Sequence, residues 1–89
     1  MEASEHFFYV LQCADGSYYA GYTNDLEKRI DAHNAGKGAK YTRARGPVSL
    51  IHKESFPTKP AAMKAEYAFK QLTKAKKIRY IAEGKEDGE

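Results

Sequence analysis

Residues 7–23 read FFYVLQCADGSYYAGYT, and this stretch decides the fold. Its two halves are rich in aromatic and β-branched residues, which favour strands, and Ala14-Asp15-Gly16 separates them, so a β-hairpin is predicted. A two-residue turn would place Tyr9 and Tyr19 on opposite faces, whereas a three-residue loop would place them on one face. Gly16 stands where the longer loop requires positive φ, so we predict the three-residue loop with a bulge. In that register the opposite face carries Phe8, Val10, Tyr18 and Tyr22.

A helix is predicted to follow the hairpin. Asn24 has a side chain suited to an N-cap, with Glu27 three positions later. Gly36 can adopt the left-handed backbone conformation that commonly ends a helix. Leu26 and Ile30 are spaced so that they lie on the buried side of this helix.

The second half of the chain predicts one strand and two further helices. The strand covers about residues 48–56, Thr58 caps the helix that follows, and Pro60 is tolerated in its first turn. Thr73 starts a short last helix. The apolar positions of the two helices are Ala62, Ala65, Phe69, Leu72, Ile78 and Ile81. The order ββαβαα, with one three-stranded antiparallel sheet flanked by helices, defines a small α+β domain.

The chain length of 89 residues favours a single domain, because a second core would bury too little surface. We expect a disordered N-terminus over 1–6, the domain over 7–82 and an acidic tail over 83–89. The apolar run 7–11 is too short for a membrane span, which predicts a cytoplasmic protein, with a monomer as the default. Cys13 is the single cysteine and the histidines lack zinc-finger spacing, so neither an internal disulfide nor a structural metal is expected.

Positive charge is concentrated in the middle of the chain. Residues 36–80 contain twelve basic and two acidic side chains, a net charge of +10, whereas residues 1–35 contain two basic and six acidic ones. A tract with so large a positive charge favours nucleic acid as the binding partner. Residues 36–47 have three glycines and no period, which predicts a basic loop. Its candidate nucleic-acid contacts are Lys37, Lys40, Tyr41, Arg43 and Arg45. For the basic side chains of residues 70–79, nucleic-acid contact and plain solubility both stay open.

The sequence resembles the GIY-YIG nuclease family, in particular its small stand-alone bacterial members, over nearly the whole chain. Phe7-Phe8-Tyr9 stands where the family has Gly-Ile-Tyr, and Tyr19-Ala20-Gly21 stands where it has Tyr-Ile-Gly. Arg29 and His33 lie on the following predicted helix, and Glu66 lies on the later one.

The resemblance implies phosphodiester hydrolysis with Mg²⁺ or Mn²⁺ as cofactor. Tyr9 would take the proton of the attacking water, Tyr19 would position water or phosphate, and Arg29 would stabilise the transition-state charge. A phenol needs nearby positive charge to act as a base at neutral pH, which Arg29 and the metal would supply. His33 would contact phosphate or serve as a competing base. Glu66 would be the metal ligand, because one carboxylate, waters and a substrate phosphate can together hold Mg²⁺.

The same residues have ordinary structural explanations. The two strand tyrosines can be half-buried packing residues. Arg29 can pair with Asp25 at the surface, beside an exposed His33, and Glu66 can form a solvent-facing pair with Lys70.

The leading hypothesis is a divalent-metal-dependent endonuclease that hydrolyses DNA phosphodiester bonds, in repair or in processing of structured DNA, with RNA still open as a substrate. One alternative is a nucleic-acid-binding module on the same fold with little or no catalysis. Tyr22 favours it, because several relatives have lysine at that position. Another alternative is an interaction subunit of a repair complex, for which the acidic tail is the candidate contact.

Overall fold

The computed structural model describes residues 5–37, 42 and 45–87, the last four without their side chains. Its elements follow the predicted order ββαβαα: β1 (His6–Gln12), β2 (Tyr18–Thr23), α1 (Leu26–Asn34), β3 (Ser49–Phe56), α3 (Lys59–Lys70) and α4 (Lys74–Asp87). The strand order is β2-β1-β3 with both pairs antiparallel, so β1 is central and β2 and β3 are edges. The predicted α+β class and three-stranded sheet are confirmed.

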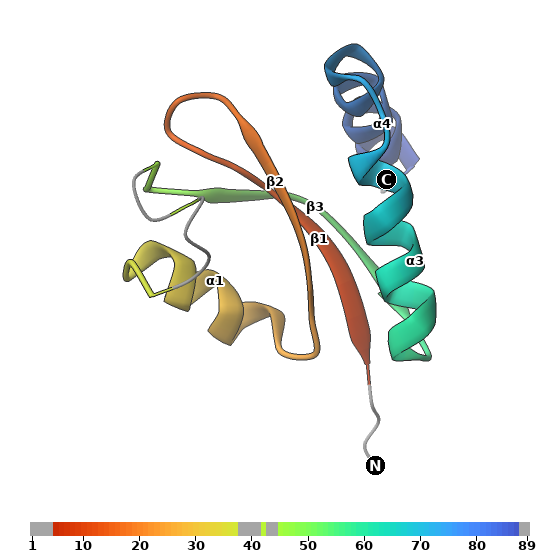
Figure 1. The fold of residues 1–89 in the computed structure, drawn as a ribbon, viewed down its shortest axis with the longest axis horizontal. Coiled ribbons are helices and arrows are strands. Elements are labelled where there is room, and N and C mark those ends of the chain that lie inside the picture. The colour runs from red at the N-terminus through yellow and green to blue at the C-terminus, as the bar shows by residue number, and fades with distance from the viewer. Residues whose placement is uncertain (1–4, 38–41, 43–44, 88–89) are drawn as a thin grey trace.

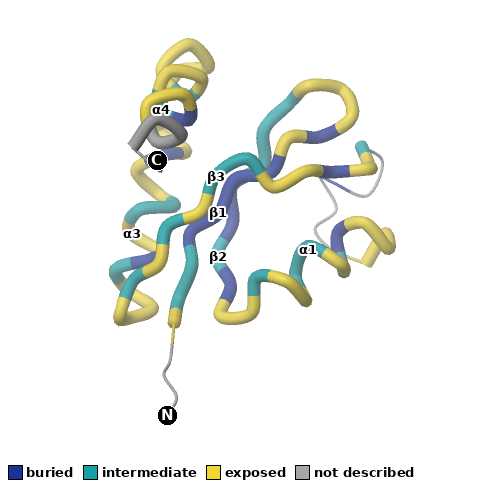
Figure 2. Tube along the Cα trace, turned by 180° about the vertical axis from the view of Figure 1, so that it is seen from behind, coloured by how far each residue is buried: buried dark blue, intermediate teal, exposed yellow. Residues whose placement is uncertain are grey.

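Helices cover both faces of the sheet. α1 lies against one face, and α3 and α4 lie against the other (Figure 1). The central strand is therefore buried along most of its length (Figure 2). Four successive residues of β1, Phe8 to Leu11, are at most 1% exposed. Both faces of β1 must accordingly be apolar, which explains why this strand is a continuous apolar run rather than an alternating one.

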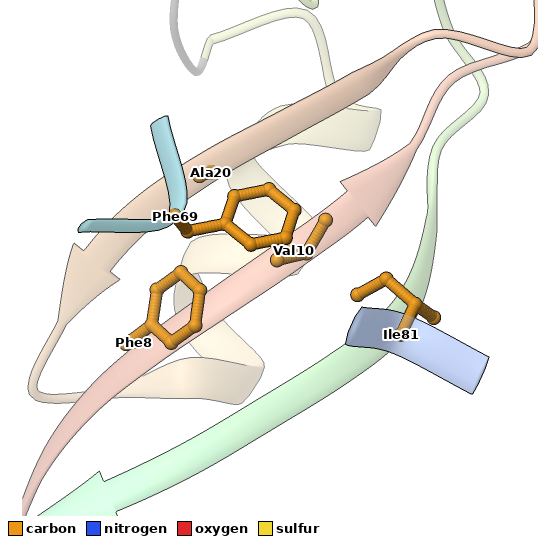
Figure 3. Packing of buried hydrophobic residues seen from close by; sticks show 5 residues of the cluster. All are labelled: Phe8, Val10, Ala20, Phe69 and Ile81. Carbon is orange, nitrogen blue, oxygen red and sulfur yellow. The ribbon is translucent and has the colours of Figure 1, made fainter. Parts of the chain in front are cut away.

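The larger core cluster lies between the sheet and the α3–α4 pair. Its buried members are Phe8, Val10, Ala20, Phe69 and Ile81 (Figure 3). Tyr18, Ile51, Phe56, Ala65, Leu72 and Tyr80 pack around them. Phe8 and Val10 alternate with the residues of the other face, as the period of a strand requires. The predicted partners Ala62 and Phe69 are buried on α3.

The smaller core cluster faces α1. It consists of Tyr9, Leu11, Cys13 and Val48, with Tyr19, Leu26 and Ile30 packed against it. Both motif tyrosines belong to this cluster, so the candidate site is built on the α1 face of the sheet.

The structure corrects the predicted start of the first helix. The N-cap is Asp25, whose carboxylate accepts a hydrogen bond from the Lys28 N–H at 3.2 Å, and not Asn24. The reason lies in Thr23, whose hydroxyl accepts from the Asp25 N–H at 3.1 Å and turns the chain one residue later than expected. Thr58 and Thr73 are caps as predicted, because they accept from the N–H groups of residues three positions on, at 3.3 and 3.2 Å.

The chain ends also differ from expectation. His6 is the first residue of β1, so the strand begins within residues 1–6, where disorder was expected. Residues 1–4 lie outside the described part. α4 continues through Gly84 to Asp87, where an acidic tail was expected to begin at residue 83. A glycine inside a helix costs only about 1 kcal/mol relative to alanine and does not end a helix by itself.

Candidate active site

The register of the hairpin puts the two motif tyrosines on one face. Tyr9 pairs with Gly21 and Leu11 with Tyr19, which is the predicted register. The loop closes with a bond from Cys13 N–H to the Ser17 carbonyl at 2.8 Å, and Gly16 has a φ of +86°. The predicted three-residue loop with glycine in the left-handed region is confirmed, and Phe8, Val10 and Tyr18 pack on the opposite face.

Gly21 allows the Tyr9 side chain to lie across the edge strand. A Cβ placed on Gly21 would be 2.5 Å from the Tyr9 hydroxyl oxygen and 2.6 Å from its Cζ. No side chain larger than hydrogen fits there without moving the tyrosine. The glycine of the Tyr19-Ala20-Gly21 tripeptide therefore shapes the site rather than a turn.

The Tyr9 phenol joins a buried chain of polar groups. Its hydroxyl is 3.1 Å from His33 Nε2, and His33 Nδ1 is 2.8 Å from the Thr42 hydroxyl. All three side chains are 1% exposed. With both ring nitrogens engaged inside the protein, His33 is neither the exposed histidine of the structural alternative nor placed to contact a phosphate directly.

Arg29 lies beside both tyrosines. Hydrogen bonding to Tyr9 is the main cause that raises the pKa of Arg29, and interactions with Tyr19 add to it. Burial raises the pKa of Tyr9, and the hydrogen bond and charge of Arg29 oppose that rise without cancelling it. Near neutral pH the phenol is therefore protonated, so Arg29 alone does not make Tyr9 a phenolate.

His33 is held in its neutral form. Burial lowers the pKa of its imidazole below the ordinary value of 6.5, and the positive charge of Arg29 lowers it further. A neutral imidazole has one N–H and one lone pair. The ring of Tyr19 lies against His33, with centroids 5.3 Å apart, and completes the packing around it.

Glu66 approaches the site from α3. Its negative charge is one of the causes that raise the pKa of Tyr9, which puts the carboxylate within electrostatic reach of the phenol. Lys70 Nζ is 2.8 Å from Glu66 Oε2, so the predicted i,i+4 pair exists, but the Glu66 side chain is only 16% exposed and does not face solvent freely. Within the described residues, no three His, Cys, Asp or Glu side chains are grouped to hold a metal ion.

The basic loop is described only in part. Lys37 is exposed just after α1. Arg45 Nε is 3.1 Å from Asp15 Oδ2, so the end of the loop is tied to the hairpin turn. Lys40, Tyr41 and Arg43 lie outside the described residues, and their predicted contacts stay predictions.

Two features of the site were not found from the sequence. Thr42 lies in a segment that was interpreted only as a basic loop. Gly21 was considered only as part of the family motif, and no steric role was assigned to it. The contact of Thr42 with His33, nine positions earlier, is a tertiary contact that no local sequence pattern indicates.

None of the helices in the described part of the chain combines the length and the apolar character that crossing a membrane would require.

Comparison with known proteins gives consistent matches. The family model of the GIY-YIG catalytic domain matches residues 5–79, a range that includes every site residue described above. A UPF0213 protein of Bacillus velezensis is 70% identical over 83 residues, covering 93% of this chain and 84% of that protein. The UPF0213 protein YazA of Bacillus subtilis is 64% identical with the same coverage.

Two solution NMR structures are similar to the fold. A UPF0213 protein from Bacillus halodurans has a TM-score of 0.59 at 49% identity and covers 88% of this chain and 83% of that one. A protein from E. faecalis has a TM-score of 0.58 at 52% identity, with 90% and 88% covered.

Proposed function

The chain belongs to the GIY-YIG catalytic domain family, and from this membership and the geometry of the site we propose that it is a divalent-metal-dependent endonuclease that hydrolyses DNA phosphodiester bonds. The observation that carries the proposal is the joining of Tyr9 and His33 by a hydrogen bond with Arg29 beside Tyr9, while the charge of Glu66 on α3 acts on the Tyr9 phenol. As part of the same proposal, the enzyme is a cytoplasmic monomer that acts in repair or processing of structured DNA.

Removal of the proton from water is assigned to Tyr9 and His33 together. Because burial keeps the Tyr9 phenol protonated, it accepts a proton from water only as it passes its own proton to His33 Nε2. Nδ1–H of the neutral imidazole donates to the Thr42 hydroxyl, which directs the Nε2 lone pair at Tyr9. The water oxygen bonds to phosphorus as its proton passes through Tyr9 to His33. The bond from phosphorus to the leaving oxygen breaks with its electron pair on that oxygen, which takes a proton from solvent, and His33 later releases its extra proton to solvent.

Arg29 and Tyr19 hold the phosphate in this scheme. The guanidinium is charged at every relevant pH and offers several N–H donors to the non-bridging oxygens. Tyr19 is half-buried and interacts with Arg29, so its hydroxyl is assigned to orient the phosphate. Stabilisation of the developing negative charge by such fixed donors is the largest expected contribution to the rate.

Glu66 is the residue that would hold the divalent ion. Its half-buried carboxylate is a hard oxygen donor of the kind that Mg²⁺ and Mn²⁺ prefer, and its proximity to Tyr9 suits an ion shared with the substrate phosphate. When bound, the ion would supply charge stabilisation at the phosphate.

The proposal is tested by incubating labelled duplex, single-stranded and branched DNA with Mg²⁺ or Mn²⁺. The wild-type protein should cleave, and a Glu66→Gln protein purified in the same way should bind DNA but not cleave it, because the amide keeps the shape and lacks the charge. Equal cleavage by both preparations would identify a contaminant and remove the support for the activity.

A second candidate is a nucleic-acid-binding module with little catalysis. Tyr22 favours it, because several related nucleases have a lysine there. It predicts that the wild-type protein binds all three DNA forms with micromolar or better affinity and shows no metal-dependent cleavage of any of them.

A further inference from the structure

Two lysines lie over tyrosine rings of the edge strand β2. Lys59 Nζ is 5.7 Å from the centroid of the Tyr22 ring, and Lys74 Nζ is 5.2 Å from that of Tyr18. Both distances are within the range of a cation–π contact. The two lysines begin α3 and α4 and are exposed, so the rings restrain each ammonium while leaving donors free toward solvent.

These two positive charges lie along β2, the strand that the Tyr9 ring crosses at Gly21. Tyr18 and Tyr22 are four residues apart on a strand, a distance of about 13 Å. Tyr9 lies over Gly21, between these two rings along the strand but on the other face of the sheet. On α3, Glu66 is seven residues after Lys59, so both lie on one side of the helix about two turns apart. Glu66, the carboxylate expected to hold the metal, lies between Lys59 and Lys74 along the chain.

The positive charge of α3 and α4 is suited to binding a polyanion. Between Lys59 and Ala82 the chain has seven lysines and arginines and a single acidic residue, Glu66, which belongs to the site itself. Because successive phosphates of a duplex strand are at least about 3.4 Å apart, the span of about 13 Å between Tyr18 and Tyr22 covers at most about four nucleotide steps. Lys59 and Lys74, each over one of these rings, are therefore placed to contact different phosphates of one strand.

We propose that Lys59 and Lys74, held by Tyr22 and Tyr18, form a phosphate-binding ridge that guides one nucleic-acid strand along the β2 edge and across the active site. This inference rests on the proposed nuclease function, and it adds a binding surface on α3 and α4 to the loop after α1. The ridge contacts the backbone and reads no sequence.

The test is the salt dependence of DNA binding without metal, where no cleavage occurs. Replacing both ridge lysines, Lys59→Gln with Lys74→Gln, should lower the slope of log affinity against log salt by about 1.8, at about 0.9 for each lost contact. The matched control removes the same charge elsewhere, with Lys53→Gln on the far edge strand and Lys64→Gln on the outer side of α3, and should leave the slope nearly unchanged. Thermal unfolding of each variant shows that the fold is retained.

The results separate the ridge from the nuclease activity. An equal loss of slope in both double variants, or no loss in the Lys59→Gln, Lys74→Gln protein, overturns the ridge even if the wild-type protein cleaves DNA with Mg²⁺. A selective loss of slope supports the ridge even if cleavage is absent, in which case the nuclease proposal alone fails. Lys59→Arg with Lys74→Arg should restore the wild-type slope.

Discussion

The hydroxyl group of Tyr9 lies over the backbone of Gly21, its partner on the neighbouring strand, so closely that a Cβ at position 21 would be 2.5 Å from the phenol oxygen. This contact lets the phenol extend across β2 and meet His33 at 3.1 Å. The two tripeptides of the family motif therefore form one structural unit, in which the glycine of the second makes room for the tyrosine of the first.

Gly21→Ala should destabilise the protein, because the added methyl collides with a buried ring that has no free space to enter. Overpacking of this kind costs about 1–3 kcal/mol, which urea unfolding would measure. Tyr9→Leu removes the ring end, so the Tyr9→Leu, Gly21→Ala protein should lose less stability than the sum of the two single changes. Additive losses would contradict a direct collision.

Much of the fold was accessible from the sequence, because local chemistry fixes it. Turn rules, together with the need for Tyr9 and Tyr19 to share one face of the sheet, assigned Gly16 to a bulged loop, and the structure has that loop and register. The incorrect predictions occur where two neighbouring side chains can fill the same structural role, such as a helix cap. Thr23 moved the helix cap from Asn24 to Asp25.

The site was less accessible, because its contacts join distant elements. Arg29, His33 and Glu66 could be named only by their place in a family pattern. The burial that keeps Tyr9 protonated depends on tertiary packing. Tyr22 was interpreted as a lost cation, yet Lys59 lies over its ring from α3, a contact across 37 positions that no local pattern reveals.

Activity should persist to lower pH than a free imidazole would allow. The pKa of His33 is lowered by burial and by Arg29, so the neutral base remains until the pH falls below 6.5. The acid limb of kcat/KM should therefore lie below that value, and NMR titration of the His33 ring should give the same midpoint.

The fold disfavours the protonated ring, so the contribution of His33 to stability is present above pH 6.5 and is lost as the pH falls through its folded pKa.

An Arg29→Gln protein offers the comparison for that experiment. Removing the second cause of the shift should raise the His33 midpoint toward 6.5, while burial, the first cause, keeps it below. A midpoint at or above 6.5 in the wild-type protein would contradict the assignment of a neutral imidazole.

Thr42 should act through His33 rather than on the substrate. Thr42→Val keeps the shape and removes the hydroxyl that lies 2.8 Å from His33 Nδ1, so the imidazole loses the bond to which the proposed mechanism assigns the choice of tautomer. We expect kcat to fall by about tenfold or more, as for loss of a buried hydrogen-bond partner, with little change in KM and a displaced acid limb. Thr42→Ser, which retains the hydroxyl, should recover most of the rate. A serine protein as slow as the valine protein would point to packing instead.

Lys70 should compete with the divalent ion for Glu66. Its Nζ is 2.8 Å from the carboxylate oxygen, and an ion placed at Glu66 must displace or share that contact. The lysine side chain is 50% exposed, so the pair is worth about 0.2–1 kcal/mol and not more. Lys70→Met should therefore lower the Mg²⁺ concentration for half-maximal cleavage by up to about fivefold, measured at saturating DNA so that weaker substrate binding does not enter. Lys64→Met, an exposed change on the same helix, should leave the requirement unaltered. A higher Mg²⁺ requirement in the Lys70→Met protein would mean that the lysine orients the carboxylate for the ion instead of competing with it.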